Sequence, residues 1–162
     1  MTIFAEPLTD AAFAAFGDVL AAGSSNPKMI NQGKCKRYHN LANLDLSDGH
    51  AGVSIFSAEP RTLPYMLDLM ERHPNGAQTF IPMSEHPFLV IVASDSGDTP
   101  VNIRAFISNG AQGINFHRNT WHGVLTPLHA PGLFAVVDLI GDRPNLEEHW
   151  FENPLRIEGS HL

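Results

Sequence analysis

The chain has one cysteine, Cys35, among its 162 residues. A single cysteine cannot form an internal disulfide, and this is typical of proteins from a reducing compartment. Lys34 and Lys36 flank the thiol, but no general base lies beside it in the sequence. We therefore expect an idle or buried cysteine, not a catalytic nucleophile.

Basic residues are also scarce. Ten Lys and Arg stand against 17 Asp and Glu, which gives a net charge of −7 at pH 7. A protein that binds nucleic acid needs a basic stripe along one face. Nucleic acid is therefore not expected as a partner.

Long apolar runs are absent as well. The longest, residues 88–93, is far shorter than the ~20 residues that a membrane span requires. The first residues lack the charged and apolar segments of a signal peptide. We expect a cytoplasmic protein with no membrane segment, folded as one globular domain over residues 1–162, since 43% of its residues are hydrophobic and 17% charged.

Short runs of strand-forming residues, separated by turn signals, account for most of the chain. Residues 104–107 and 113–116 flank Asn109-Gly110, a dipeptide that closes hairpins, and a β-hairpin is predicted there. Residues 65–73 fit either a helix or a half-buried strand, and the prolines and glycine that bound them favour the strand. The pattern predicts an all-β protein, an antiparallel sandwich or barrel. Further strands are expected at residues 35–39, 52–56, 79–81, 88–93, 121–126 and 134–139.

The clearest helix is short and lies near the N-terminus. Thr9 is the expected N-cap, Phe13 and Phe16 form one apolar face, and Gly17 is expected at the C-terminal end. One further helical turn is expected at residues 146–150.

Two segments place polar side chains at the ends of predicted strands. The first contains Glu71, Arg72 and His73 and is followed by Gln78, and the second runs from His117 to His122. We expect the two segments to meet at one mouth of the barrel. Asp138, on an apolar strand, needs a partner if it is buried, and a pocket His or Arg is expected.

This arrangement resembles the metal-binding motifs of cupins, whose fold is an antiparallel β-barrel called the double-stranded β-helix. In that comparison His73 is the first ligand, Asn75 stands where a second His belongs, Gln78 takes the acidic position and His122 is the His of the second motif. The implied metal ligands are His73, Gln78 and His122. Transition metals prefer imidazole and carboxylate to neutral amides, so whether a metal is bound stays open.

Several long strings resemble those of ureidoglycolate lyases, formerly called ureidoglycolate hydrolases. They are INQG (30–33), RYHNLA (37–42), ERHPNGAQTFIPM (71–83) and RAFISNGAQGINFHRNTWH (104–122). The resemblance implies a cupin-like homodimer of allantoin and purine catabolism that cleaves (S)-ureidoglycolate to glyoxylate and urea. It also implies nickel or another divalent ion as a possible cofactor.

The residues suit that reaction. One carbon of ureidoglycolate bears a hydroxyl, a carboxylate and a ureido nitrogen, so cleavage needs a base at the hydroxyl and an acid at the departing nitrogen. His residues and Arg residues can supply the proton transfer and the carboxylate contact, respectively. The candidates for proton transfer are His73, His117, His122, His39 and Glu71. The candidates for substrate binding are Arg72, Arg118, Arg37, Gln78, Asn31, His39 and Trp121, the last as a wall of the core.

Within this set we expect Arg72 or Arg118 to bind the carboxylate, His122 or His73 to move protons, and Gln78 to orient the substrate. Two other functions stay open. One is a cupin-like domain that binds a small carboxylate and signals its presence without catalysis. The other is a hydrolase that releases ammonia and carbon dioxide from the same substrate.

Overall fold

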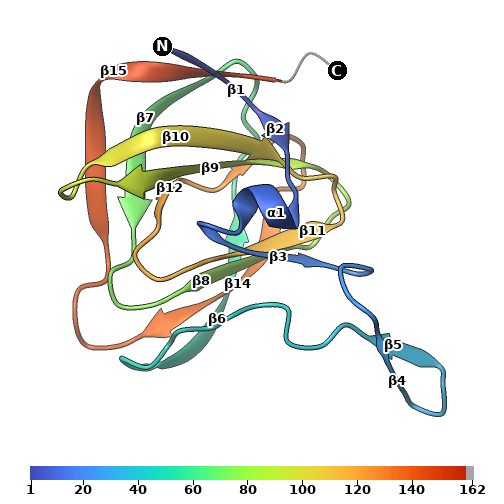
Figure 1. Ribbon diagram of the computed structural model, residues 1–162. Helices are drawn as coiled ribbons and strands as arrows, with labels where there is room; N and C mark the ends of the chain where they lie inside the picture. The colour runs from blue at the N-terminus through green and yellow to red at the C-terminus, as the bar shows by residue number, and fades with distance from the viewer. Residues whose placement is uncertain (160–162) are drawn as a thin grey trace.

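The computed structural model describes residues 1–159, and nearly all of its regular structure is β-strand (Figure 1). Among these residues the one helix is α1 (Asp10–Phe13). The strands are β1 (Thr2–Phe4), β2 (Glu6–Pro7), β3 (Gly17–Ala21), β4 (Lys28–Ile30), β5 (Cys35–Arg37), β6 (His50–Ser57), β7 (Tyr65–Arg72), β8 (Gln78–Pro82), β9 (Phe88–Asp95), β10 (Pro100–Ile107), β11 (Gln112–Phe116), β12 (Trp121–Gly123), β13 (Thr126–Pro127), β14 (Leu133–Ile140) and β15 (Glu147–Glu158).

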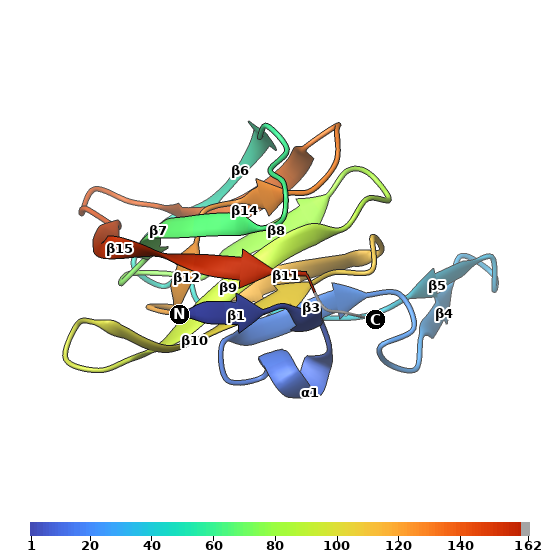
Figure 2. The same ribbon diagram turned by 90° about the horizontal axis from the view of Figure 1, so that it is seen from above.

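Two sheets form the body of the molecule. The first has the strand order β1-β15-β7-β12-β9-β10-β2, with β13 paired to β9, and the second has the order β3-β11-β8-β14-β6. Figure 2 shows the two layers from above. The expected all-β, cupin-like barrel is confirmed, and so is the strand expected at residues 65–73.

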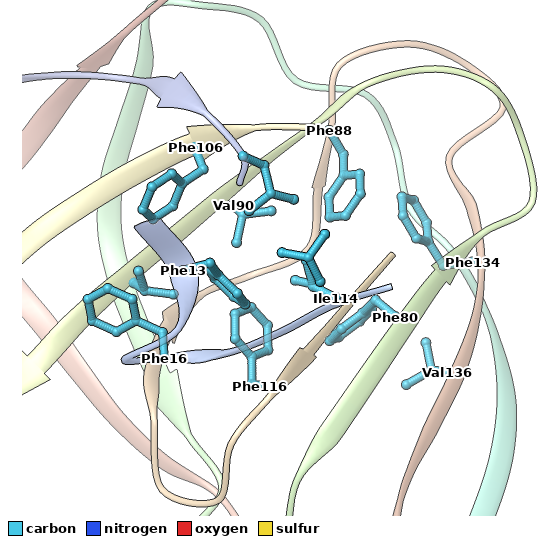
Figure 3. Packing of buried hydrophobic residues seen from close by; sticks show 13 residues of the cluster. Phe13, Phe16, Phe80, Phe88, Val90, Phe106, Ile114, Phe116, Phe134 and Val136 are labelled. Carbon is cyan, nitrogen blue, oxygen red and sulfur yellow. The ribbon is translucent and has the colours of Figure 1, made fainter. Parts of the chain in front are cut away.

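The main core lies between the sheets (Figure 3). Phe13 of α1 is fully buried there, with its ring centroid 5.8 Å from that of Phe106 and 6.1 Å from that of Phe116. Full burial of a side chain of this size contributes about 1.5–3 kcal/mol. The apolar face of α1 therefore belongs to the core.

The predicted hairpin at Asn109-Gly110 is wrong. Both strands exist, but β10 pairs with β9 and β2, whereas β11 pairs with β3 and β8. Gly110 has φ 87°, and a Cβ there would lie 2.2 Å from the carbonyl oxygen of Glu85. The turn therefore carries the chain from one sheet to the other, a topology that local sequence does not specify.

Two end-of-element predictions are also corrected. The helical turn expected at residues 146–150 is the start of β15, because β7 offers a free edge with which this segment pairs. Thr9 does cap α1, accepting a hydrogen bond from the Ala12 amide, but the helix ends at Phe13, with Ala14 as its C-cap. Gly17 instead begins β3, where a Cβ would meet the Asn115 carbonyl oxygen at 1.9 Å.

The hairpin formed by β4 and β5 stands apart from both sheets and projects from the body in both views (Figures 1 and 2). We call residues 28–37 the arm. As for membranes, residues 1–159 include no helix with the length and apolar character to cross one.

Candidate active site

The end of β7 and the short strand β12 carry the candidate site. His122 lies directly opposite Glu71 in the pairing of β12 with β7. Side chains of paired residues lie on the same face of a sheet, and successive residues alternate between faces. Glu71, His73 and His122 therefore share the inner side of the barrel, where β8 adds Gln78.

These side chains converge. Ligand atoms of Glu71, His73 and His122 all lie within 4.8 Å of one another, and the two imidazole centroids are 5.2 Å apart. The meeting of two segments that are about 50 residues apart in sequence is therefore present in the structure. The cluster contains Glu71 where the sequence comparison placed Gln78 as the third metal ligand.

His122 is a buried, neutral imidazole. Its ring stacks on Phe116 at 4.2 Å with an interplanar angle of 5°, and its Nδ1 donates to the Gly123 carbonyl oxygen at 3.0 Å. Burial, with a contribution from the charge of His73, lowers the pKa of His122 to about 3. Its Nε2 is buried and has no hydrogen-bond partner among the described residues. The geometry thus favours a lone-pair donor at His122 over a proton carrier.

His73 is held at both ring nitrogens. Nδ1 donates to the Asn145 carbonyl oxygen at 2.6 Å, and Nε2 lies 3.1 Å from Oε1 of Gln78. The Gln78 amide in turn donates to Asp138 at 3.2 Å. Each nitrogen of His73 faces an oxygen, so the protonated ring can donate at both positions.

Within residues 1–159 Asp138 pairs with neither a His nor an Arg, contrary to the expectation from the sequence. It lies opposite Gln78 in the pairing of β14 with β8 and reaches His73 only through that amide. The connection depends on cross-strand register, which the sequence pattern does not give.

Glu71 is the carboxylate nearest to the two imidazoles, 4.0 Å from Nδ1 of His122. Burial raises the pKa of Glu71, the nearby carboxylate of Glu148 adds to the rise, and the charge of His73 opposes it. A half-buried carboxylate of raised pKa beside an imidazole is a good candidate for proton transfer.

Arg72 faces the other way. Its guanidinium binds Asp95, Asp98 and Glu147 and lies 4.5 Å from the ring centroid of Trp121. The Trp121 indole itself donates to Asp95 at 2.8 Å. The geometry therefore does not support Arg72 or Trp121 as substrate contacts, since both lie on the face of β7 and β12 opposite the three site residues.

Replacement of Arg72 by Gln tests this assignment. Since Arg72 is 5% exposed and binds three carboxylates, we expect a loss of about 1–3 kcal/mol in the free energy of unfolding. The KM for substrate should not change, because the side chain points away from the site. Urea denaturation and steady-state kinetics measure the two effects, and a large rise in KM with unchanged stability would restore Arg72 as a ligand.

Arg118 and His117 hold the corner between β11 and β12. Arg118 donates to the Pro74 carbonyl oxygen at 2.8 Å and to Asp48 at 2.6 Å. His117 contacts Asp18 at 3.2 Å. Both side chains are thus engaged, and neither belongs to the cluster of Glu71, His73 and His122.

The remaining candidates lie elsewhere. Asn31 and Arg37 belong to the arm, and His39 lines a 420 Å³ hollow beside Asp18. The structure does not bring these residues to the site of their own chain.

Sequence reasoning missed Asn145 and Phe116 as site residues. Asn145 holds His73 through its backbone carbonyl, and its side-chain oxygen accepts a hydrogen bond from the backbone N–H of Asn75 at 2.7 Å. A backbone carbonyl carries no sequence signal. Phe116, by contrast, lies on a strand that the sequence predicted, and the pairing of β11 with β8 sets it opposite Gln78.

Comparison with known proteins shows which family the chain resembles. A family model described as ureidoglycolate lyase matches residues 1–158. The ureidoglycolate lyase of Rhodobacter capsulatus is 52% identical over 155 residues, which cover 95% of this chain and 96% of that protein. Those of Chelativorans sp. and Agrobacterium fabrum are 47% and 44% identical, with coverage of 96% and 97% of this chain and 95% and 97% of theirs.

Proposed function

Because the chain belongs to the ureidoglycolate lyase family, we propose that it cleaves (S)-ureidoglycolate to glyoxylate and urea at the site of Glu71, His73 and His122. The observation that carries the choice of site is the convergence of these three side chains within 4.8 Å. The match to the family over nearly the whole chain disfavours a sensor that lacks catalysis.

Glu71 is the proposed base. Its carboxylate takes the proton of the substrate hydroxyl, and the carbon–oxygen double bond of glyoxylate forms as the carbon–nitrogen bond breaks. Its raised pKa makes it a stronger base than an exposed carboxylate. A positioned group of this kind typically contributes about 10²–10⁴-fold to the rate.

His73 is the proposed acid. Protonated on Nε2, it delivers that proton to the departing ureido nitrogen, so that urea leaves as a neutral molecule. The Asn145 carbonyl oxygen fixes the ring at Nδ1, and Nε2 points toward Oε1 of Gln78. We also propose that Gln78, which contacts both His73 and Asp138, orients the urea group.

The same three residues also fit a divalent metal ion, as an alternative in which Glu71 and His73 are ligands and not the base and the acid. Two imidazoles and a carboxylate are ligands that nickel and other transition metals accept, and the unpartnered Nε2 of His122 presents a lone pair. A bound ion would supply a Lewis acid that polarises a substrate oxygen. We infer that His122 serves as a ligand, because its pKa of about 3 leaves it without a proton to give at neutral pH.

The cellular setting is part of the proposal. We infer a cytoplasmic homodimer that acts in allantoin and purine catabolism, with ureidoglycolate as its small-molecule partner. The high similarity to named ureidoglycolate lyases supports the pathway.

Product analysis tests the function. Purified protein is incubated with racemic ureidoglycolate, and glyoxylate and ammonia are followed with and without added urease. We expect glyoxylate to appear at once and ammonia only when urease is present. Ammonia without urease would indicate the hydrolase, and substrate binding without any product would indicate the sensor.

A further inference from the structure

Among residues 1–159 the proposed site has no uncommitted Lys or Arg for the substrate carboxylate. Arg72 lies on the opposite face in contact with three carboxylates, and Arg118 binds Asp48 and the Pro74 carbonyl oxygen. Arg143, in the loop before β15, contacts Asp48 at 3.1 Å. A small carboxylate is normally bound by a free guanidinium or ammonium group.

Unpaired cations are concentrated on the arm. It carries all three lysines of the chain and one arginine, four of the ten basic residues within ten positions. In residues 1–159 no ion pair or hydrogen bond involves these four side chains. The four are Lys28, Lys34, Lys36 and Arg37.

The pairing within the arm is electrostatically unfavourable by itself. Lys28 lies directly opposite Arg37 in the pairing of β4 with β5, so both cations are on one face of the hairpin. Like charges in such a pair destabilise a hairpin. An external anion between them would relieve the repulsion, and this pair is therefore suited to a carboxylate.

The arm does not lie near the site of its own chain. Both views place β7 and β12 on one side of the molecule and the arm on the far side (Figures 1 and 2). At the base of the arm, Tyr38 shares a hollow with Ile81 and Pro82, and Pro82 pairs with Phe134 near the start of β14. Gln78 and Asp138 mark the site at the other end of the same two strands.

An exposed apolar face continues from the base of the arm. Ile81 is 43% exposed, Ile55 60% and Val53 74%. Ile81 and Ile55 both lie opposite Ala135, and Val53 lies opposite Val137, so all three project from the outer side of the second sheet. Aliphatic side chains clustered on a sheet face in this way indicate an interaction surface.

We propose that a second copy of this chain packs on the face formed by Val53, Ile55 and Ile81, and that its arm supplies Lys28 and Arg37 to bind the substrate carboxylate at the first copy's site. In this dimer the two-fold axis lies in the plane of the contact and runs perpendicular to β14, so that the β14 strands of the two copies point in opposite directions. It therefore brings the arm of each copy to the site end of the other. The inference rests on the proposed function for the identity of the anion, but not for the contact between copies.

Kinetics of an arm variant provide the first test. We expect Lys28→Ala/Arg37→Ala to raise the KM for ureidoglycolate by roughly tenfold to a hundredfold, the effect of losing a charged hydrogen-bonded pair. The melting temperature should not fall, because both side chains are exposed and form no hydrogen bond or ion pair within residues 1–159. The matched control is Arg61→Ala, an exposed cation before β7, which should leave KM unchanged.

Subunit mixing tests whether the arm acts at the site of its own chain or at the site of the second copy. The arm variant is co-expressed with His73→Ala under separate affinity tags, and the mixed dimer is purified. That dimer contains one complete site, made from the intact cluster of one chain and the intact arm of the other, so about half of the wild-type kcat/KM should return. Activity that stays at the level of the arm variant alone would overturn the inference.

Sedimentation separates this inference from the proposed function. The wild-type chain should sediment as a dimer, and Val53→Glu/Ile55→Glu should be a folded monomer with the raised KM of the arm variant. A monomeric wild type would exclude the shared site whatever the activity. A dimer with no glyoxylate release from any variant would instead refute the proposed reaction and, with it, the carboxylate role of the arm.

Discussion

Glu71→Gln should lower kcat for ureidoglycolate cleavage by about 10²–10⁴-fold, the usual contribution of a positioned general base. The amide keeps the size of the side chain but cannot take the hydroxyl proton. The free energy of unfolding should change little, because no hydrogen bond of the Glu71 side chain is found among residues 1–159. Steady-state release of glyoxylate measures the effect.

Glu148→Gln is the matched control. Glu148 lies opposite Glu71 in the pairing of β15 with β7, and it is the exposed carboxylate that contributes to the raised pKa of Glu71. Its loss should leave most of the rate. Equal losses of kcat in the two variants would indicate that the negative charge of the site matters and that Glu71 has no special role.

His122→Phe should abolish nickel binding while preserving the fold. Phe has a similar planar ring and can keep the stacking on Phe116. It removes the buried Nε2, which has no hydrogen-bond partner among the described residues, and also the Nδ1 hydrogen bond to the Gly123 carbonyl oxygen. Loss of that one hydrogen bond costs about 1 kcal/mol, which the fold should tolerate. We expect the affinity for nickel to fall at least about a hundredfold, since changes even in residues that only support a ligand cost 10–100-fold.

Isothermal titration of metal-stripped protein with nickel and manganese measures this loss, and thermal unfolding checks the fold. His149→Phe serves as the control, because His149 contacts Trp121 and Phe151 and lies outside the cluster. If His122→Phe binds nickel as the wild type does, the cluster is not a metal site. Add-back of metal to the stripped wild type then shows whether cleavage itself depends on an ion.

The period of a β-strand already contained part of the geometry of the candidate site. Glu71 and His73 are two residues apart, and the period of a strand places them on one face with Arg72 on the other. The pattern therefore already contained the reason to separate Arg72 from the site, although the sequence hypothesis grouped it there. The opposing position of His122 needed the pairing of β12 with β7, which lies beyond local signals.

The topological errors share a cause. Turn chemistry at Asn109-Gly110 and the polar composition of residues 146–150 are local properties, while the partners of β10, β11 and β15 are distant in sequence. Local propensity says that a strand can form, and the sheet edge that is available decides where it pairs. The same limit applies to Asp138, whose connection to His73 runs through a residue on another strand.

The short length of β12 limits how this enzyme can be redesigned. Trp121 and His122 are neighbours on a strand of three residues, and one is bound to the Asp95 carboxylate while the other belongs to the cluster with Glu71 and His73. A substitution that shifts Trp121 by a fraction of an ångström must shift the imidazole too. Libraries aimed at new substrates should therefore leave β12 untouched.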